Sequence, residues 1–196
     1  MLVPDLRTCL KDALAMRGGA SSDFDLNAGI EAPNVKLTPA SVLIAIRAET
    51  ETVILTKRSA RLKHHPGQIA FPGGKKDPGD PTVIDAALRE ASEEIGLPAT
   101  MVDVIGTMPQ HQTVTGFAVT PVVGLIGDNF RSIPEQGEVS EVFEVPLAHV
   151  TDPQMFQVER RRWQGRMRHF YTVPFGPYYI WGATARILRA LAERMP

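Results

Sequence analysis

One acid-rich segment constrains this chain more than any other feature of its sequence. Residues 73–97 read GGKKDPGDPTVIDAALREASEEIGL, with a glycine pair at the start and three glutamates near the end. Asp80 is a suitable N-cap, Pro81 suits the first position of a helix, and Gly96 is typical of a helix end. The segment therefore predicts a glycine-led turn followed by a helix over about residues 81–95.

The side chains of this helix divide into an apolar stripe and an acidic face. The stripe, which we expect to be buried, recurs at helical spacing and consists of Ile84, Leu88, Ala91 and Ile95. Glu90, Glu93 and Glu94 lie three and four residues apart, so they should share a neighbouring, more exposed face. Such acids repel one another and face the negative end of the helix dipole. Arg89 alone cannot neutralise three carboxylates.

Two interpretations of the acidic face are open. It can be a solvated surface, which is the usual place for glutamates. It can also be a cation site, because magnesium and manganese prefer clusters of oxygen ligands. The glycine-led turn beside a locally unfavourable charge arrangement favours the second interpretation.

The segment closely resembles the Nudix box of the Nudix hydrolases, G-x5-E-x7-R-E-U-x-E-E-x-G-U, in which U is aliphatic. The residues that match one for one are Arg89, Glu90, Glu93, Glu94 and Gly96, with Ala91 and Leu97 at aliphatic positions. Two departures are present. Asp80 stands where the first glutamate is expected, and one extra residue separates it from Arg89.

The preceding residues 54–74 resemble the signature of Nudix enzymes that act on coenzyme A, L-L-T-x-R-S-x3-R-x3-G-x3-F-P-G-G. The matching residues are Leu55, Thr56, Arg58, Ser59, Gly67, Phe71, Pro72, Gly73 and Gly74. Lys63 replaces the second arginine, which keeps the charge but loses the planar, bidentate guanidinium. Basic residues beside an acidic helix suit a diphosphate substrate, which needs both metal and cations.

The resemblance implies a magnesium- or manganese-dependent hydrolysis of a small-molecule diphosphate, with coenzyme A cleaved to 3′,5′-ADP and 4′-phosphopantetheine. Expected metal ligands are Glu90, Glu94 and Glu93. Expected catalytic residues are Glu93 as a base, Arg89 as the group that orients the glutamates, and Glu138 outside the box, which is preferred to Glu141. Expected substrate-binding residues are Arg58, Arg61, Lys63, Gly67, Phe71, Gly73 and Gly74.

The length and pattern of the chain predict an α/β fold in one domain, residues 1–196. A length of 196 residues with 43% apolar residues suffices for one packed core. The N-terminal helix and loop occupy residues 1–36, the box 73–97 and the C-terminal helix 174–196. The expected elements are a helix at 4–17, a polar loop at 18–34, strands at 40–47, 52–57, 68–71, 102–110, 117–126 and one ending near 145, a hairpin of 155–163 with 167–173, and a helix at 181–194. Strands with helices on two sides indicate an α/β/α sandwich with a mixed sheet, as the resemblance also implies.

Composition excludes several classes of protein. The net charge is −1, so no overall field attracts nucleic acid or a membrane. Cys9 is the only cysteine, which excludes an internal disulfide and is consistent with a cytoplasmic protein. No apolar run approaches the length of a membrane span.

Some alternatives remain open at this stage. The substrate can be another nucleotide diphosphate such as NADH, ADP-ribose or a damaged nucleoside triphosphate, or the fold can serve as a non-catalytic nucleotide sensor. Five arginines between Arg160 and Arg168 flank aromatic residues on the late hairpin. They could hold a nucleotide or a second protomer in a homodimer, although a solvent-exposed hairpin is the simpler interpretation.

Overall fold

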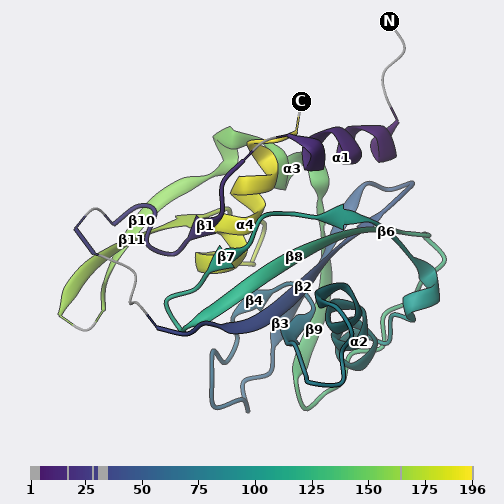
Figure 1. The fold of residues 1–196 in the computed structure, drawn as a ribbon, viewed down its shortest axis with the longest axis horizontal. Helices are drawn as coiled ribbons and strands as arrows, with labels where there is room; N and C mark the ends of the chain where they lie inside the picture. The colour runs from purple at the N-terminus through teal and green to yellow at the C-terminus, as the bar shows by residue number, and fades with distance from the viewer. Residues whose placement is uncertain (1–4, 17, 28, 31–34, 164, 196) are drawn as a thin grey trace, which may run out of the picture.

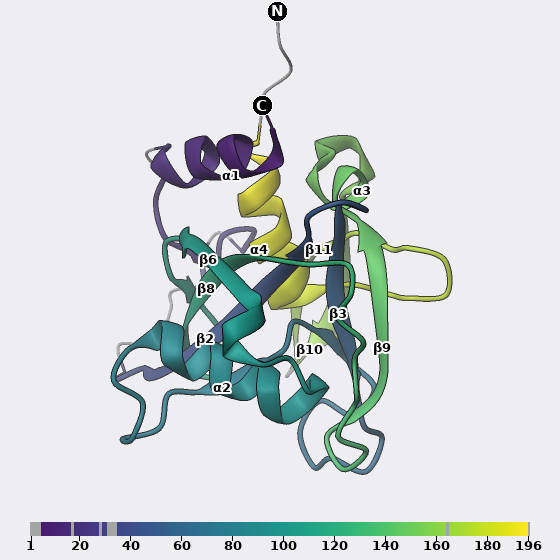
Figure 2. The same ribbon diagram turned by 90° about the vertical axis from the view of Figure 1, so that its right-hand side faces the viewer.

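The fold is a mixed β-sheet between two layers of helices, as the sequence predicts. The computed structural model describes residues 5–16, 18–27, 29–30, 35–163 and 165–195. Helix α2 (Val83–Ile95) covers one face of the sheet, whereas α4 (Gly182–Ala192), α1 (Leu6–Ala15) and α3 (Leu147–Thr151) lie on the other side (Figures 1 and 2). No helix in the described part of the chain has the length and apolar character needed to cross a membrane.

The main sheet contains nine described strands. They are β1 (Ser21–Ser22), β2 (Thr38–Arg47), β3 (Thr52–Arg58), β4 (Ile69–Ala70), β5 (Gly73–Lys75), β6 (Val102–Thr107), β7 (His111–Gln112), β8 (Phe117–Ile126) and β9 (Val139–Pro146). Strands β2 and β8 run parallel over their full ten residues at the centre. Strand β3 pairs antiparallel with β2, β4 and β9, while β5 pairs antiparallel with β2. The sheet is therefore mixed.

The centre of the sheet is apolar on both faces, which explains the continuous apolar run of β2. Leu43 and Ala45 pack toward α2, whereas the intervening Ile44 and Ile46 pack into the core that contains α4. All four side chains are fully buried. Because neighbouring residues of a strand point to opposite faces, one strand supplies both cores. The two cores fix α2 and α4 on opposite sides of the sheet.

The start of α2 differs from the prediction. Thr82, rather than Asp80, is the N-cap, and it forms a capping box in which its hydroxyl oxygen accepts from the Asp85 backbone N–H and the Asp85 carboxylate accepts from the Thr82 N–H. Asp80 is buried in the preceding turn and serves another purpose. Gly96 ends the helix in the left-handed region, with φ of 70°, as predicted.

Three further segments refine the expected elements. The glycine pair is not a simple turn, because Gly73–Lys75 forms strand β5 against β2. The predicted polar loop at 18–34 contains β1, which is held by the buried His111: its ring nitrogens lie 2.9 Å from the Ser21 hydroxyl and 3.1 Å from the Asp23 carboxylate. Strands β10 (Gln157–Trp163) and β11 (Arg166–Thr172) form the predicted hairpin as a separate two-stranded sheet. Short 3₁₀ turns cover Ala99–Met101 and Pro153–Met155.

The capping box gives a direct test of where α2 begins. Thr82→Ala removes the hydroxyl that accepts from the first turn of the helix, so we expect a loss of about 1 kcal/mol in the free energy of unfolding. Urea denaturation measures this loss, and Thr82→Ser is the matched control because it keeps the hydroxyl. Equal stability of Thr82→Ala and the wild-type protein would contradict this assignment of the cap.

Candidate active site

The acidic end of α2 lies directly against strand β5. The Gly73 backbone N–H donates to Oε2 of Glu94 at 3.1 Å. A Cβ atom placed on Gly74 would lie only 2.5 Å from Oε1 of Glu90, so the Glu90 carboxylate occupies the space that any other side chain would fill. Gly73 has φ of 155°, and a Cβ there would meet the backbone of β2 at 2.4 Å. Gly73 is thus required by its close approach to the β2 backbone, whereas a side chain at position 74 would displace the Glu90 carboxylate.

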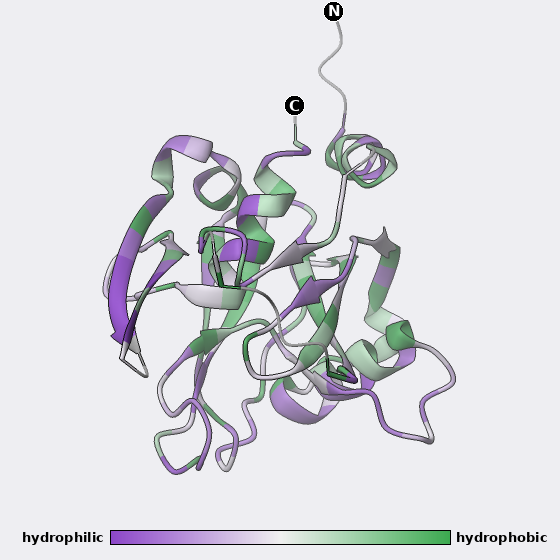
Figure 3. Cartoon of the chain, turned by 60° about the vertical axis from the view of Figure 1, so that its left-hand side comes forward, coloured by the Kyte–Doolittle hydropathy of each residue, from purple (hydrophilic) through white to green (hydrophobic). Residues whose placement is uncertain are grey.

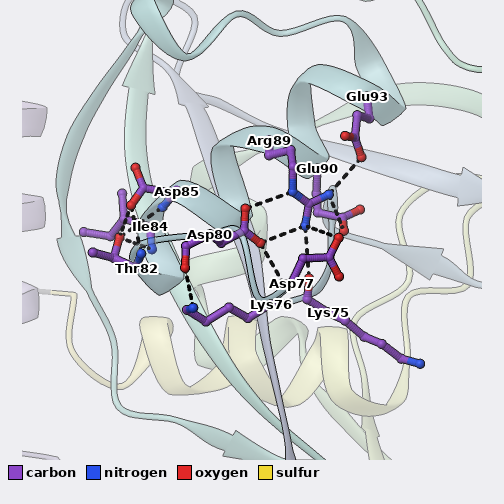
Figure 4. A network of polar contacts seen from close by, with 10 residues as sticks. All are labelled: Lys75, Lys76, Asp77, Asp80, Thr82, Ile84, Asp85, Arg89, Glu90 and Glu93. Atoms are coloured by element: carbon purple, nitrogen blue, oxygen red, sulfur yellow. Dashed lines mark hydrogen bonds and ion pairs between the residues drawn. The ribbon is translucent and has the colours of Figure 1, made fainter.

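Arg89 is the centre of a polar network at this end of the site (Figure 4). Its Nε and Nη2 donate to the two carboxylate oxygens of Asp80, each at 3.0 Å. Its Nη1 donates to Glu90 at 3.0 Å and to Glu93 at 2.9 Å, and Nη2 also donates to the Lys75 carbonyl at 3.1 Å. One guanidinium therefore ties the turn before α2, strand β5 and two box glutamates together.

Asp80 is the part of this network that the sequence did not predict correctly. It stands where the family pattern has a glutamate, and it grips Arg89 in the bidentate manner that matches carboxylate and guanidinium geometry. These hydrogen bonds lower the pKa of Asp80 and raise that of Arg89, so both groups remain charged. The Asp77 backbone N–H, at 2.8 Å, fixes the Asp80 carboxylate from the other side.

The three box glutamates do not share one exposed face, which corrects the expectation. The side chain of Glu93 is 59% exposed, whereas that of Glu94 is only 4% exposed. Burial raises the pKa of Glu94 to about 7, opposed by the Gly73 N–H and by the Arg58 guanidinium at 3.8 Å. Glu94 is therefore a carboxylate held near its point of ionisation at neutral pH.

Glu90 and Glu138 add further negative charge beside Glu94. Burial raises the pKa of Glu90, and the hydrogen bond from Arg89 opposes this shift. The charge of Glu138 raises the pKa of both Glu90 and Glu94. The pairing of β3 with β9 determines the position of Glu138. Its backbone carbonyl accepts from the Ser59 N–H at 2.7 Å, next to the Arg58–Val139 pair of the two strands. Residues distant in sequence thus form one acidic centre.

Glu141, the weaker of the two candidates outside the box, is engaged elsewhere. Its carboxylate accepts from the Tyr178 hydroxyl at 2.5 Å, and the Tyr178 ring stacks on Phe143 with centroids 3.5 Å apart. Within the described residues, no group of three acidic, histidine or cysteine side chains is already arranged as a metal site. Hydrogen bonds from Arg89 hold the carboxylates of Glu90 and Glu93, so one oxygen of each points toward the guanidinium.

The predicted substrate-binding residues fall into three environments. Arg58 faces Glu94 on the α2 side of the sheet. Arg61, Lys63 and Gly67 lie on the exposed connection between β3 and β4. Phe71 is only 3% exposed and belongs to the core on the α4 side, directly before Pro72 and the two glycines. Its role in substrate binding stays a prediction.

Two contacts of Arg89 could not be read from the sequence. The Lys75 carbonyl reaches it because β5 is paired with β2, and Asp77 lies 3.8 Å from it because of the turn that follows. A backbone carbonyl carries no signal in the residue types. In the sequence, the presence of two aspartates shortly before the helix, Asp77 and Asp80, was the feature that could have indicated carboxylate partners for Arg89.

Comparison with known proteins agrees with this geometry. The NUDIX domain family model matches residues 37–167, which include every box residue and the segment before the box. The chain belongs to the Nudix hydrolase family. Curated relatives carry the name "Uncharacterized Nudix hydrolase NudL": the protein of Enterobacter sp. (strain 638) is 42% identical over 162 residues, and that of Klebsiella pneumoniae (strain 342) is 44% identical over 162 residues. Each alignment covers 78% of this chain and 80% of the relative.

Among solved structures, a Nudix hydrolase from M. smegmatis, RenU, is similar to this chain at 28% sequence identity and a TM-score of 0.48. The match covers 59% of this chain and 74% of that one. In the chain described here, the helix of the Nudix box is α2, the arginine of the box is Arg89, and the buried glutamate of the box is Glu94.

The raised pKa of Glu94 predicts that stability depends on pH. Because the folded group titrates near pH 7 and an unfolded glutamate near about 4.3, stability from this group is fully present below the unfolded pKa and is lost as pH rises through 7. In EDTA at pH 8, we expect the free energy of unfolding of the Glu94→Gln variant to be higher than that of the wild-type protein by on the order of 2 kcal/mol. At pH 5 the difference should be smaller.

Urea denaturation at several pH values measures this difference. Glu93→Gln, on the exposed face of the same turn, is the control, and it should not remove the wild-type loss of stability between pH 5 and pH 8. A wild-type stability that stays constant over this range, or an equal effect of the two substitutions, would contradict the buried state of Glu94.

Proposed function

We propose that this Nudix hydrolase cleaves the diphosphate of coenzyme A or its acyl derivatives, giving 3′,5′-ADP and 4′-phosphopantetheine or its acyl form, with magnesium or manganese as cofactor. The observation that carries the proposal is the joining of two segments. The buried carboxylate of Glu94 meets both Gly73 and Arg58, which belong to the segment resembling enzymes that act on coenzyme A. These two contacts support a single site formed by the box and the signature.

The donor set of the site fits a hard divalent cation. Glu90 and Glu94 bring two largely buried carboxylates together, and burial raises the pKa of each. Two such acids beside the charge of Glu138 are unfavourable without a counter-ion, and oxygen is the ligand that magnesium and manganese prefer. We assign Glu90 and Glu94 as the ligands, with Glu93 as a further one. When bound, such a cation lowers the pKa of water and neutralises phosphate charge.

The side chains of the protein then divide the work of hydrolysis. We assign Arg89 the role of holding the Glu90 and Glu93 carboxylates in position, because it donates hydrogen bonds to both. A glutamate takes the proton of the attacking water, whose oxygen bonds to one phosphorus while the bridging P–O bond breaks and the leaving phosphate keeps the electron pair. Glu138 is preferred as this base, because Glu93 is held by Arg89, whereas the charge of Glu138 acts on both buried acids.

Product analysis tests the reaction. After incubation with coenzyme A and magnesium, mass spectrometry should detect 3′,5′-ADP and 4′-phosphopantetheine, and EDTA should abolish both. Glu94→Gln should lose at least a hundredfold in kcat, because one negative ligand is removed. Brisk cleavage of NADH or ADP-ribose without cleavage of coenzyme A would transfer the protein to the alternative substrate class. Absence of turnover on every diphosphate would favour a nucleotide sensor.

The structure also separates two kinds of basic residue in the signature. Lys63 is exposed on the connection between β3 and β4, whereas Arg58 lies at Glu94, so we expect Lys63 to meet the 3′-phosphate that distinguishes coenzyme A from dephospho-coenzyme A. Lys63→Ala should raise the KM for coenzyme A by roughly fivefold, because an exposed charge contact contributes about 1 kcal/mol to binding. The KM for dephospho-coenzyme A should stay unchanged. Arg58→Ala should impair both substrates, because Arg58 faces Glu94.

Steady-state kinetics on the two substrates measure this difference. Lys11→Ala is the control for the loss of a lysine, since Lys11 lies on α1, on the other side of the sheet from α2 (Figure 2). An equal effect of Lys63→Ala on both substrates would mean that Lys63 contacts the shared diphosphate instead.

A further inference from the structure

The hairpin of β10 and β11, residues 157–172, projects from the body of the protein and is called here the arm (Figure 1). Its inner half, as far as the Arg160–His169 pair, is fastened to the body, where Arg168 lies over the Phe24 ring and Arg186 and Arg189 lie over the Tyr171 ring. Asn27 bonds both the N–H and the carbonyl of His169, at 2.8 and 3.0 Å. The Tyr179 hydroxyl donates to Glu159 at 2.7 Å, and Phe170 packs edge-on against Trp181 at 5.3 Å.

Beyond these contacts, the described residues of the arm are exposed. Arg160, Arg161 and Arg162 on β10 and Arg166 and Met167 on β11 all lie open to solvent. A two-stranded hairpin without a supporting layer is marginally stable in water. The arm is hydrophilic over most of its length (Figure 3), yet it is not a plain solubilising surface. Apolar side chains are exposed among its charges, as the pairing of the strands shows.

Cross-strand pairing places an apolar and basic surface on one face of the arm. Val158, Arg160 and Arg162 lie opposite Tyr171, His169 and Met167, and side chains of such pairs point to the same face. Val158 is 54% exposed and Met167 is 46% exposed. Of the seven exposed large hydrophobic residues that the described chain contains, four lie on the arm or next to it, and these are Met155, Val158, Met167 and Tyr179.

The composition of the arm is that of a protein interface. It contains five arginines, three aromatic residues and a methionine, with one glutamate and no lysine. Arginine, methionine and aromatic residues are enriched in the centres of protein interfaces, where lysine and glutamate are depleted. A solubilising hairpin would be expected to use lysine and glutamate instead.

The charge of the arm is complementary to that of the rest of the chain. With five arginines and one glutamate in the arm, the remainder holds 16 basic and 21 acidic residues. The remainder of a second copy thus has an excess of acidic over basic residues, which complements the net positive charge of the arm. The same net excess of acidic residues disfavours nucleic acid as the occupant, because it opposes the long-range attraction of a phosphate backbone. Pairing between the β10 edges of two arms would oppose three arginines to three arginines, which is unfavourable.

We infer that the arm is a dimerisation element. The face that carries Val158, Arg160, Arg162 and Met167 packs on the body of a second protomer, and the arm of that protomer packs reciprocally on the first. Such an arrangement is isologous, so it closes as a dimer and does not propagate. It covers the exposed side chains of Val158 and Met167 and supports the outer half of the arm, beyond the contacts that Tyr171 makes with α4.

Sedimentation equilibrium of the full chain tests this inference. The wild-type protein should be a dimer at micromolar concentration, and high salt should weaken the association because charges contribute to it. Arg160→Glu combined with Arg162→Glu should raise the dissociation constant at least a hundredfold. Lys11→Glu combined with Lys36→Glu, two exposed lysines outside the arm, makes the same change in net charge and should leave the dimer intact.

A second variant separates loss of association from loss of folding. Val158→Ser combined with Met167→Ser keeps every charge, and it should weaken the dimer at least tenfold while circular dichroism and the far-UV melting profile of the monomer remain those of a folded protein. A wild-type protein that stays monomeric at all concentrations would overturn the inference. So would a dimer that both arm variants retain, or an arm that binds RNA in place of a second copy.

Discussion

The bidentate contact between Arg89 and Asp80 is the interaction on which the acidic site depends. Carboxylates at neighbouring positions of a helix end repel one another, and burying them increases the cost. Arg89 offsets this repulsion for Glu90 and Glu93, but a flexible arginine alone would not hold them in place. Asp80, fixed by the turn before the helix, determines where the guanidinium lies. The turn, the helix and strand β5 are thereby one rigid unit.

The two-faced sheet explains how this unit meets residues that are distant in sequence. Alternate residues of β3 point to opposite faces, so Leu55 packs into the core with α4 while Arg58 faces Glu94 beside α2. Strand β9 pairs with β3 and brings Glu138 to the same end. The long parallel pairing of β2 with β8 lies at the centre and holds this edge in register. The apolar cores on the two faces of the sheet therefore hold the strands that position Arg58 and Glu138, although neither residue belongs to these cores.

The arm lies mostly outside the two cores, although Tyr171 near its base packs against the core that contains α4. Its base is fixed by Asn27 and by aromatic contacts, and its outer part presents arginines and apolar side chains to solvent. Arginines of the acidic site and of the arm therefore differ in how firmly their side chains are held. Arg89 is constrained by five hydrogen-bond contacts, whereas Arg160 and Arg162 lie exposed on the projecting hairpin.

Sequence by itself determined the sandwich, the helix that carries the box, and the identity of Arg89, Glu90, Glu93 and Glu94 as one group, because apolar periodicity and residue spacing are local properties. It could not decide which glutamate is buried. That depends on the docking of α2 against β5, which desolvates Glu94 and leaves Glu93 in water. Nor could it give Asp80 its partner or place Phe71 in the core. Contacts between segments and the removal of water exist only once the sheet has formed, so only the tertiary structure decided them.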